Sequence, residues 1–396
     1  MKHSRLMLRL LAMLALATQL GGCSWGIWDF LRDSKTRRPD KLVSFDEEVR
    51  IKKNWSVGVG DGQGDEFNRL RPALVNGVIY AAGADGVVVA VRASDGKRLW
   101  KQDLDKPISG AIGAGGSIAV VGTEKAEIIA LDTATGQTKW QTNVSSEVLA
   151  APATDGKIVV VQGLDGRLSG LDAADGKQVW SYDNQVPALT LRGTSSPLIV
   201  GNTVLSAQAG GTVVALALDN GTLRWEERIA LPKGKSDLDR LVDIDGDLVV
   251  GEGNMLLATS YQGNLSAVDM NTGQTRWRVK ESSYVGAGFG FGNIYSVTDE
   301  DTVNAYRIGQ DTPQWSNDQM TLRRLTQPVG FNNYLALGDY EGYIHFLAQS
   351  DGRFVGRVKV DGDGVRSHML AEGNTLYVLS NGGDLVSYTI TDRSAK

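Results

Sequence analysis

Residues 131–140 read LDTATGQTKW, and versions of this phrase recur along the 396-residue chain. Each full copy begins at the end of an apolar run and continues with a polar turn that contains a glycine. It ends at a tryptophan four residues after that glycine. The repeat marks are listed here by position: Trp55, Trp100, Trp140, Trp180, Trp225, Trp277, Trp315 and, where a tryptophan is expected, Gly356. A period of about 40 to 50 residues is typical of propellers and solenoids.

Each repeat contains short strands joined by tight turns. Residues 73–82 are apolar on both sides of Asn76-Gly77, and Asn-Gly between strand-like runs is the strongest short hairpin signal. A second strand type, in outline small-Asp-Gly-x-Val-x-Ala-Leu, precedes the turn and occurs eight times between residues 86 and 388. Four short strands make one propeller blade, so the sequence predicts an all-β fold, an eight-bladed β-propeller over residues 49–391.

The two ends of the repeat array complement each other. Trp55 follows no turn, and the last strand, residues 383–388, is followed by no tryptophan. We therefore expect the strand at residues 49–57 to pair with the C-terminal strand, which closes the propeller and leaves no open sheet edge. An open solenoid is the alternative, although the sequence has no polar capping repeat.

The recurrent tryptophan has a structural explanation. An indole that packs against a glycine-bearing neighbouring blade buries a large apolar area and satisfies its single donor. A role in stacking on a ligand is the alternative. A tryptophan that recurs at the same place in successive repeats, however, is typical of packing between blades. We expect the tryptophans to set the angle between blades.

The N-terminus predicts export. A basic start is followed by an apolar run over residues 6–20 and by Gly21-Gly22-Cys23. The run is shorter than the roughly 20 residues that a spanning helix needs. This ending resembles the lipobox of bacterial lipoproteins, which implies a signal peptide at residues 1–22, acylation of Cys23 (palmitate among the acyl groups) and a lipidated tether at residues 23–48. An uncleaved apolar segment with an incidental cysteine is the alternative.

Charge and cysteine content narrow the choice of partners. The chain carries a net charge of −5. Removal of residues 1–22 takes away three basic residues and no acidic one, which leaves 38 basic against 46 acidic residues, a net charge of −8. Nucleic acid is therefore not an expected partner. Cys23 is the only cysteine, so no disulfide within the chain is possible.

The repeats also resemble the tryptophan-docking repeats of quinoprotein dehydrogenases, which implies an enzyme as one alternative. Those enzymes are much longer, bind a quinone and calcium over the central channel, and often carry a disulfide of adjacent cysteines. The string at residues 243–247, DIDGD, imitates a calcium loop but continues with Leu248 where glycine is needed, and Asn254, rather than glutamate, stands at the twelfth place. No other catalytic motif is present. We expect no catalysis, no cofactor and no metal.

The lipobox, the acidic tether and eight degenerate quinoprotein-like blades together resemble the BamB family over the whole chain. The resemblance implies a noncatalytic scaffold lipoprotein of the β-barrel assembly machinery, at the periplasmic face of the outer membrane. It implies docking on the BamA-type barrel-inserting subunit through a periplasmic POTRA domain, and unfolded outer-membrane proteins are a second expected partner class. Ser24, where aspartate would mean retention in the inner membrane, agrees with this location. A cell-envelope binding module for wall or polysaccharide is a third alternative.

Two stretches where the repeat spacing lengthens carry the expected docking residues. Insertions in repeat proteins map to loops on one face, often the binding face. By motif match, the resemblance assigns a first contact group (Leu189, Leu191 and Arg192) and a second (Arg240, Asp243 and Asp245). An internal pairing of Arg192 with Asp243 or Asp245, which would hold the two loops together, is a compatible alternative.

Overall fold

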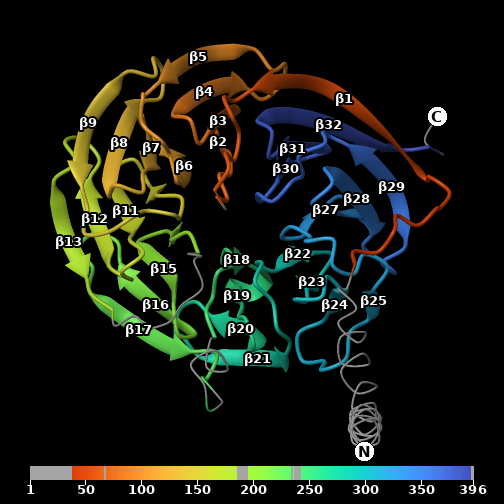
Figure 1. Cartoon of the computed structure of the whole chain (residues 1–396). Helices are drawn as coiled ribbons and strands as arrows, with labels where there is room; N and C mark the ends of the chain where they lie inside the picture. Colours follow the sequence, from red (N-terminus) through yellow and green to blue (C-terminus); the bar gives the residue numbers. More distant parts are fainter. Residues whose placement is uncertain (1–37, 67, 185–194, 233–234, 236–241, 394–396) are drawn as a thin grey trace, which may run out of the picture. The chain divides into compact units, whose positions relative to one another are not determined.

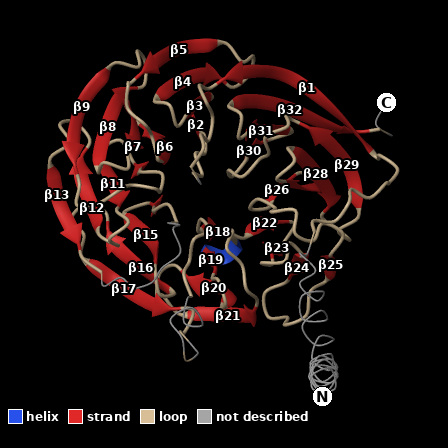
Figure 2. Ribbon diagram, viewed as in Figure 1, coloured by secondary structure: helices blue, strands red, loops and turns tan. Residues whose placement is uncertain are grey.

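A computed structural model describes residues 38–66, 68–184, 195–232, 235 and 242–393. The compact unit that begins at Asp40 contains eight antiparallel sheets of four strands each. Figure 1 shows these sheets arranged as blades around a common centre, and Figure 2 shows that strands make up nearly all of the regular structure. The predicted all-β propeller with eight blades is confirmed. Within the described residues, no helix is long and apolar enough to cross a membrane.

The strands of each blade follow one another from the centre outward. Blades 1 and 2 are β2 (Ala73–Val75), β3 (Val78–Ala82), β4 (Val87–Arg92), β5 (Arg98–Asp103), and β6 (Gly110–Gly115), β7 (Ile118–Gly122), β8 (Glu127–Asp132), β9 (Thr138–Asn143). Blades 3 and 4 are β10 (Ala153–Thr154), β11 (Ile158–Gln162), β12 (Leu168–Asp172), β13 (Gln178–Tyr182), and β14 (Leu198–Val200), β15 (Thr203–Gln208), β16 (Thr212–Ala217), β17 (Leu223–Arg228).

The second half of the ring repeats this order. Blades 5 and 6 are β18 (Val249–Val250), β19 (Met255–Thr259), β20 (Asn264–Asp269), β21 (Thr275–Lys280), and β22 (Gly288–Gly290), β23 (Asn293–Val297), β24 (Val303–Tyr306), β25 (Trp315–Asn317). Blades 7 and 8 are β26 (Val329–Phe331), β27 (Tyr334–Gly338), β28 (Tyr343–Ala348), β29 (Phe354–Lys359), and β30 (Leu370–Glu372), β31 (Thr375–Leu379), β32 (Asp384–Asp392), β1 (Val49–Gly58). A short 3-10 helix, η3 (Glu252–Asn254), precedes β19.

Alternating strand direction gives the ring two distinct faces. The loops from the outer strand of one blade to the inner strand of the next, together with the turns between second and third strands, form what we call the connection face. The remaining two turns of each blade form the turn face. The Asn76-Gly77 hairpin lies on the turn face, and both residues have positive φ, 51° and 72°, as a type I′ turn requires. The predicted hairpin is therefore confirmed.

Blade 8 is built from both ends of the chain. β1 pairs antiparallel with β32 from Val49 opposite Asp392 to Gly58 opposite Asp384. The predicted closure is confirmed, and it removes the exposed sheet edges that an open array would leave. Figure 1 shows β1 as the outermost strand beside β32.

Seven tryptophans dock on the neighbouring blade in the same way. Each Nε1 donates a hydrogen bond of 2.8–3.2 Å to a backbone carbonyl in the next blade, within the turn that joins its third and fourth strands. At six of these contacts a positive-φ glycine lies against the indole, so close that an added Cβ would fall 2.3–2.7 Å from it. The packing role expected for the tryptophans is confirmed.

The eighth junction explains why Gly356 replaces tryptophan. The third strand of blade 8 ends near the C-terminus and its fourth strand begins the propeller, so no turn joins them and an indole would have nothing to dock on. Val49 and Ile51 of β1 lie against Gly356 instead. Opposite Gly356 stands the large Phe346, whereas Trp100, Trp140 and Trp225 each face an alanine. In blade 7 the large side chain therefore lies on the third strand and the small one on the fourth, the reverse of the other three blades.

Residues 40–48 pack along the outer side of blade 7. Arg323 Nη1 donates to the carbonyl of Asp40 at 2.8 Å, and Arg357 Nη1 donates to the carbonyl of Val43 at 2.9 Å. Phe45 stacks on Phe354 with ring centroids 5.3 Å apart. This part of the segment expected to be a tether is therefore held against the propeller.

Beneath this segment lies a polar network whose centre, Arg323, Asp339 and His345, is buried. Asp339 accepts hydrogen bonds from Arg323 Nε at 2.8 Å and from Nε2 of His345 at 2.9 Å, and both side chains at that second contact have no exposure. Arg357 Nε donates to Nδ1 of His345 at 3.1 Å. Since Nδ1 is the acceptor, the proton of the neutral imidazole sits on Nε2. Removing one member would leave buried polar groups unpaired.

We predict that Gly136→Ala destabilises the propeller more than Gly77→Ala does. Both glycines have nearly the same φ, +74° and +72°, but an added Cβ meets Trp100 at 2.6 Å only at position 136 and meets nothing within 4 Å at position 77. The difference in the free energy of unfolding, measured by urea denaturation, should be about 1–3 kcal/mol, the usual cost of overpacking.

The comparison cancels the backbone strain that alanine suffers at positive φ, which costs about 1 kcal/mol at each site. Equal losses for the two variants would contradict indole docking as the contact that positions the blades.

Candidate functional site

The candidate site is the connection face around the second predicted contact group. Asp243 and Asp245 lie in the connection between blades 4 and 5 and are buried, with exposed fractions of 3% and 6%. Asp243 accepts a hydrogen bond at 3.0 Å from the backbone N–H of Gly210. The Asp243 carboxylate therefore ties the base of this loop to the turn between β15 and β16. The other assigned residues lie outside the described part of the chain; they are Cys23, Leu189, Leu191, Arg192 and Arg240.

The roots of the two lengthened loops are joined. The backbone N–H of Ser196 donates to Asp247 Oδ1 at 2.8 Å, although 51 residues separate them. The hydroxyl of Ser196 accepts a hydrogen bond from the backbone N–H of Ala151 at 3.2 Å. The connections that enter blades 3, 4 and 5 thus meet at one place on the connection face.

A cavity of about 50 Å³ lies at the centre of this face. Its lining comes from connections around the ring and includes Arg69, Arg71, Asp245, Asp247 and His368. Arg71 Nε lies 3.4 Å from Asp247 Oδ2, and Arg69 Nη1 donates to the carbonyl of Asp245 at 3.3 Å. Acidic and basic side chains therefore meet at the centre.

Two groups of this cavity have pKa values shifted in opposite directions. Burial raises the pKa of Asp245 to about 6, against the attraction of Arg69. Burial, helped by the charge of Arg71, lowers the pKa of His368 to about 4. Burial disfavours the charged form of both groups, which is why the acid shifts upward and the imidazole downward.

The size of the central cavity limits what it can hold. A volume of about 50 Å³ holds one or two water molecules, whereas small-molecule sites measure roughly 300–1,000 Å³. The centre therefore does not fit the quinone that the likeness to quinoproteins would imply. Within the described residues, no group of three or more His, Cys, Asp or Glu side chains is placed to hold a metal ion.

Sequence reasoning missed the basic residues of this face. Arg69 and Arg71, Arg324, and Arg366 each lie a few residues before an inner strand: β2, β26 and β30 respectively. Basic residues at this fixed place in the repeat were the available signal, because the segment before each inner strand leads toward the centre.

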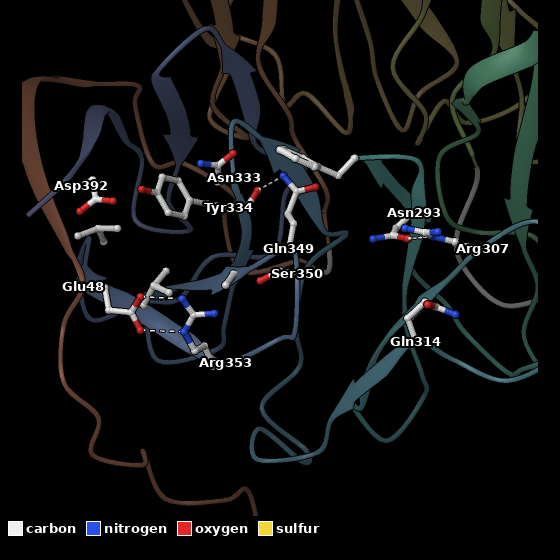
Figure 3. A pocket seen from close by; sticks show the side chains of 14 residues that line it. Glu48, Asn293, Arg307, Gln314, Asn333, Tyr334, Gln349, Ser350, Arg353 and Asp392 are labelled. Atoms are coloured by element: carbon white, nitrogen blue, oxygen red, sulfur yellow. Dashed lines mark hydrogen bonds and ion pairs between the residues drawn. The ribbon is translucent and has the colours of Figure 1, made fainter. Parts of the chain in front are cut away.

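A larger cavity of about 540 Å³ lies on the turn face at the seam of blades 6, 7 and 8. Figure 3 shows Glu48 and Arg353 side by side at one end, with Arg307 and Asn293 at the other. Arg353 donates to both carboxylate oxygens of Glu48 at 2.8 Å, a bidentate pair that joins the residue before β29 to the residue before β1. This cavity lies on the face opposite the predicted docking residues.

The fold and the connection face together define a class of protein. It is a closed eight-bladed propeller with quinoprotein-like repeats, whose centre is filled by its own charged side chains. A family model described as outer membrane protein assembly factor BamB matches residues 84–317. The chain belongs to the BamB family.

Known relatives cover nearly the whole chain. An outer membrane protein assembly factor BamB of Pseudomonas aeruginosa is 53% identical over 379 residues, 96% of this chain and 98% of the relative. The Escherichia coli relative of the same name is 36% identical over 383 residues, 94% of this chain and 96% of the relative.

Solved structures agree on the fold. The crystal structure of BamB from Moraxella catarrhalis superposes with a TM-score of 0.79 at 29% identity and covers 86% of this chain and 100% of that one. A quinohemoprotein alcohol dehydrogenase from Comamonas testosteroni superposes with a TM-score of 0.68 at 14% identity, covering 86% of this chain and 76% of that one. The latter likeness is one of fold alone.

We predict opposite pH profiles for Asp245→Asn and His368→Gln. Between pH 4 and 6 the folded protein keeps a proton on Asp245 that the unfolded chain releases, so this group adds stability as the pH falls. The unfolded chain protonates its histidine near pH 6.5 while folded His368 stays neutral, so this group removes stability as the pH falls.

From pH 7 to 5, His368→Gln should therefore gain about 1–2 kcal/mol of unfolding free energy relative to the parent, and Asp245→Asn should lose about as much. Urea denaturation at several pH values measures both. The double variant serves as the control, because it should follow the parent's profile; parallel profiles for the two single variants would refute the assignment.

Proposed function

We propose that the chain is a noncatalytic docking scaffold in outer membrane protein assembly. Its connection face binds the BamA-type barrel-inserting subunit through a periplasmic POTRA domain, and unfolded outer-membrane proteins are its second class of partner. Membership of the BamB family supports the assembly role. The observation that carries the docking role is the 2.8 Å contact between Ser196 and Asp247, which joins the roots of both lengthened loops.

The proposed contact residues then act as one surface. Leu189 and Leu191 supply an apolar anchor, and Arg192 and Arg240 supply charge at its rim. Interfaces of this composition draw most of their affinity from a few central side chains. Asp243 and Asp245, both buried, act by holding the loop in shape.

A membrane anchor completes the proposal. Residues 1–22 act as a signal peptide, and acylated Cys23 holds the protein at the periplasmic face of the outer membrane through a tether. Several acyl chains on one residue give stable anchoring, whereas one chain binds only marginally. Residues 40–48 of this segment pack on blade 7, so the propeller holds the chain from Asp40 onward.

Affinity isolation from solubilised membranes is the experiment that tests the proposed function. The barrel-inserting subunit should be recovered as the main partner, and recovery of glycan or peptidoglycan enzymes alone would favour the cell-envelope binding module. Purified protein mixed with pyrroloquinoline quinone and calcium should show neither a bound quinone spectrum nor dye-linked dehydrogenase activity; a stoichiometric quinone spectrum would favour the enzyme.

We predict that Arg192→Glu, and separately Leu189→Ala combined with Leu191→Ala, weaken binding to the periplasmic region of the barrel-inserting subunit. Truncating a central apolar anchor typically costs about 2 kcal/mol or more, roughly thirtyfold in Kd. Placing like charges together costs several kcal/mol, so the charge reversal should be at least as severe if Arg192 faces a carboxylate. Titration calorimetry measures the Kd, and thermal denaturation measures the Tm.

Trp140→Ala is the control, because it should lower the Tm while leaving the loop chemistry intact. Normal binding by the loop variants, or a loss of binding only in proportion to the loss of Tm, would mean that the docking face is assigned wrongly. A fall in Tm for Arg192→Glu would instead indicate the internal pairing with Asp243 or Asp245.

We predict that Cys23→Ala yields a folded propeller that no longer fractionates with the outer membrane, or a precursor that is not cleaved. The first propeller strand begins only at Val49, so the substitution lies outside the blades. Cell fractionation locates the protein, and circular dichroism with thermal denaturation reports its fold. Loss of the fold together with the location would contradict the division between tether and propeller.

A further inference from the structure

A second cavity on the connection face gathers arginine side chains. Its volume is about 510 Å³, and Arg69, Arg324 and Arg366 line it from the connections that enter blades 1, 7 and 8. Val285, Leu325 and Val365 form its buried floor. The cavity adjoins the central one, because both are lined by Arg69, Val285 and Arg366.

From this convergence of three guanidinium groups in one recessed cavity, we propose that the cavity binds the carboxylate side chains of an acidic, partly apolar polypeptide segment. The segment's carboxylates meet the arginines, and its apolar side chains contact the floor. This site goes beyond the proposed docking loops, since it involves different blades and none of the residues assigned to them.

The arginines are held in place by backbone carbonyls. Arg69 Nη1 donates to the carbonyl of Tyr284 at 3.3 Å, in addition to that of Asp245, and Arg366 Nη1 donates to the carbonyl of Glu66 at 3.0 Å. Carbonyl oxygens orient a guanidinium group but carry no net charge. A pre-oriented, planar donor favours a carboxylate over other acceptors.

Arg324 is presented by a strained loop. Leu322 and Arg324 have φ of 59° and 55°, a region that residues other than glycine rarely adopt. The carboxylate of Asp301 accepts hydrogen bonds from the backbone N–H groups of Arg324 at 2.7 Å and Leu325 at 2.9 Å, which stabilises this conformation. Glycine would adopt it without strain, so an arginine here points to a role for its exposed side chain.

The remaining polar groups complete an anion site. Asp65 and Asp363 also line the cavity, so three basic and two acidic side chains share its wall, in a protein whose net charge is negative. Tyr284 stays a hydrogen-bond donor, because burial raises its pKa to about 12. Burial, followed by the charges of Arg324 and Arg69, lowers the pKa of Arg366, and a bound anion would relieve this mutual repulsion.

The shape of the site favours a polypeptide over an anionic membrane surface. Arg69 and Arg366 are only partly exposed and lie above a buried apolar floor. A side chain can enter such a cavity, whereas a flat array of lipid headgroups reaches only exposed cations. Tyr340 stands at the edge of the cavity with its ring 5.2 Å from the guanidinium of Arg323, which fixes one wall.

The test uses two dye-labelled peptides of about ten residues, one alternating Glu with Leu and the other Lys with Leu. Fluorescence anisotropy should show binding of the Glu peptide that weakens with salt, and no binding of the Lys peptide. Arg324→Glu and Arg366→Glu should each weaken the Glu peptide roughly tenfold or more. Arg307→Glu, a charge reversal beside the turn-face cavity, should leave its affinity unchanged.

A sharper pair of variants separates binding from folding. Arg324→Gly removes the guanidinium and also the backbone strain, so it should weaken the peptide without lowering the Tm. Leu322→Gly relieves the same kind of strain two residues away and removes no charge, so it should keep full affinity.

Three outcomes would overturn the site: equal binding of the Lys peptide, full affinity in the arginine variants, or competition of the Glu peptide by anionic lipid vesicles. Because the assay contains no barrel-inserting subunit, a failure here leaves the loop docking untouched. A failure of the loop variants to lose partner binding likewise leaves the peptide result standing.

Discussion

The docking of an indole on the next blade's turn is the contact on which the ring depends. Six of the seven docked tryptophans combine a hydrogen bond to a neighbour's carbonyl with the burial of a large apolar surface against a glycine that no other residue could replace without strain. A blade by itself is a small sheet with two apolar faces. Repeating one directional contact around the ring buries those faces and sets the angle between blades, so that the connections converge on a common centre.

The seam shows what happens where this contact is impossible. A chain that closes its ring with strands from both ends cannot also have a turn between them, and position 356 accordingly holds a glycine, with Val49 and Ile51 against it. The chain compensates nearby. Arg353 pairs with Glu48, and the buried network of Arg323, Asp339, His345 and Arg357 holds the segment before β1. A buried network of this kind adds less to stability than to the choice of one arrangement, since each member requires its partners.

Charge is distributed unevenly over the connection face. The connection entering blade 5 brings the carboxylates of Asp245 and Asp247 to the centre, and the connections entering blades 7, 8 and 1 bring arginines. The central groups leave little free volume, about 50 Å³, which suits a scaffold. The lateral cavity keeps its volume and is lined by three arginines. One rigid ring can in this way present two chemically different binding regions side by side.

Much of this was accessible from the sequence. The period of the tryptophans and the hairpin turns predicted eight blades, because each blade is a local unit and its sequence pattern repeats. The unmatched ends at Trp55 and residues 383–388 predicted the pairing of β1 with β32. The lengthened spacing also located the connections that meet at Ser196 and Asp247.

Tertiary structure alone decided the rest. The burial of Asp243 and Asp245, the opposite pKa shifts of Asp245 and His368, and the convergence of Arg69 with Arg324 and Arg366 depend on side chains from blades far apart in the sequence. The sequence by itself determined the repeat and its closure, since these follow from contacts between neighbouring units. Which side chains meet at the centre and rim of the ring depends on how the eight blades are arranged in space. The periodic pattern of the sequence does not contain that information.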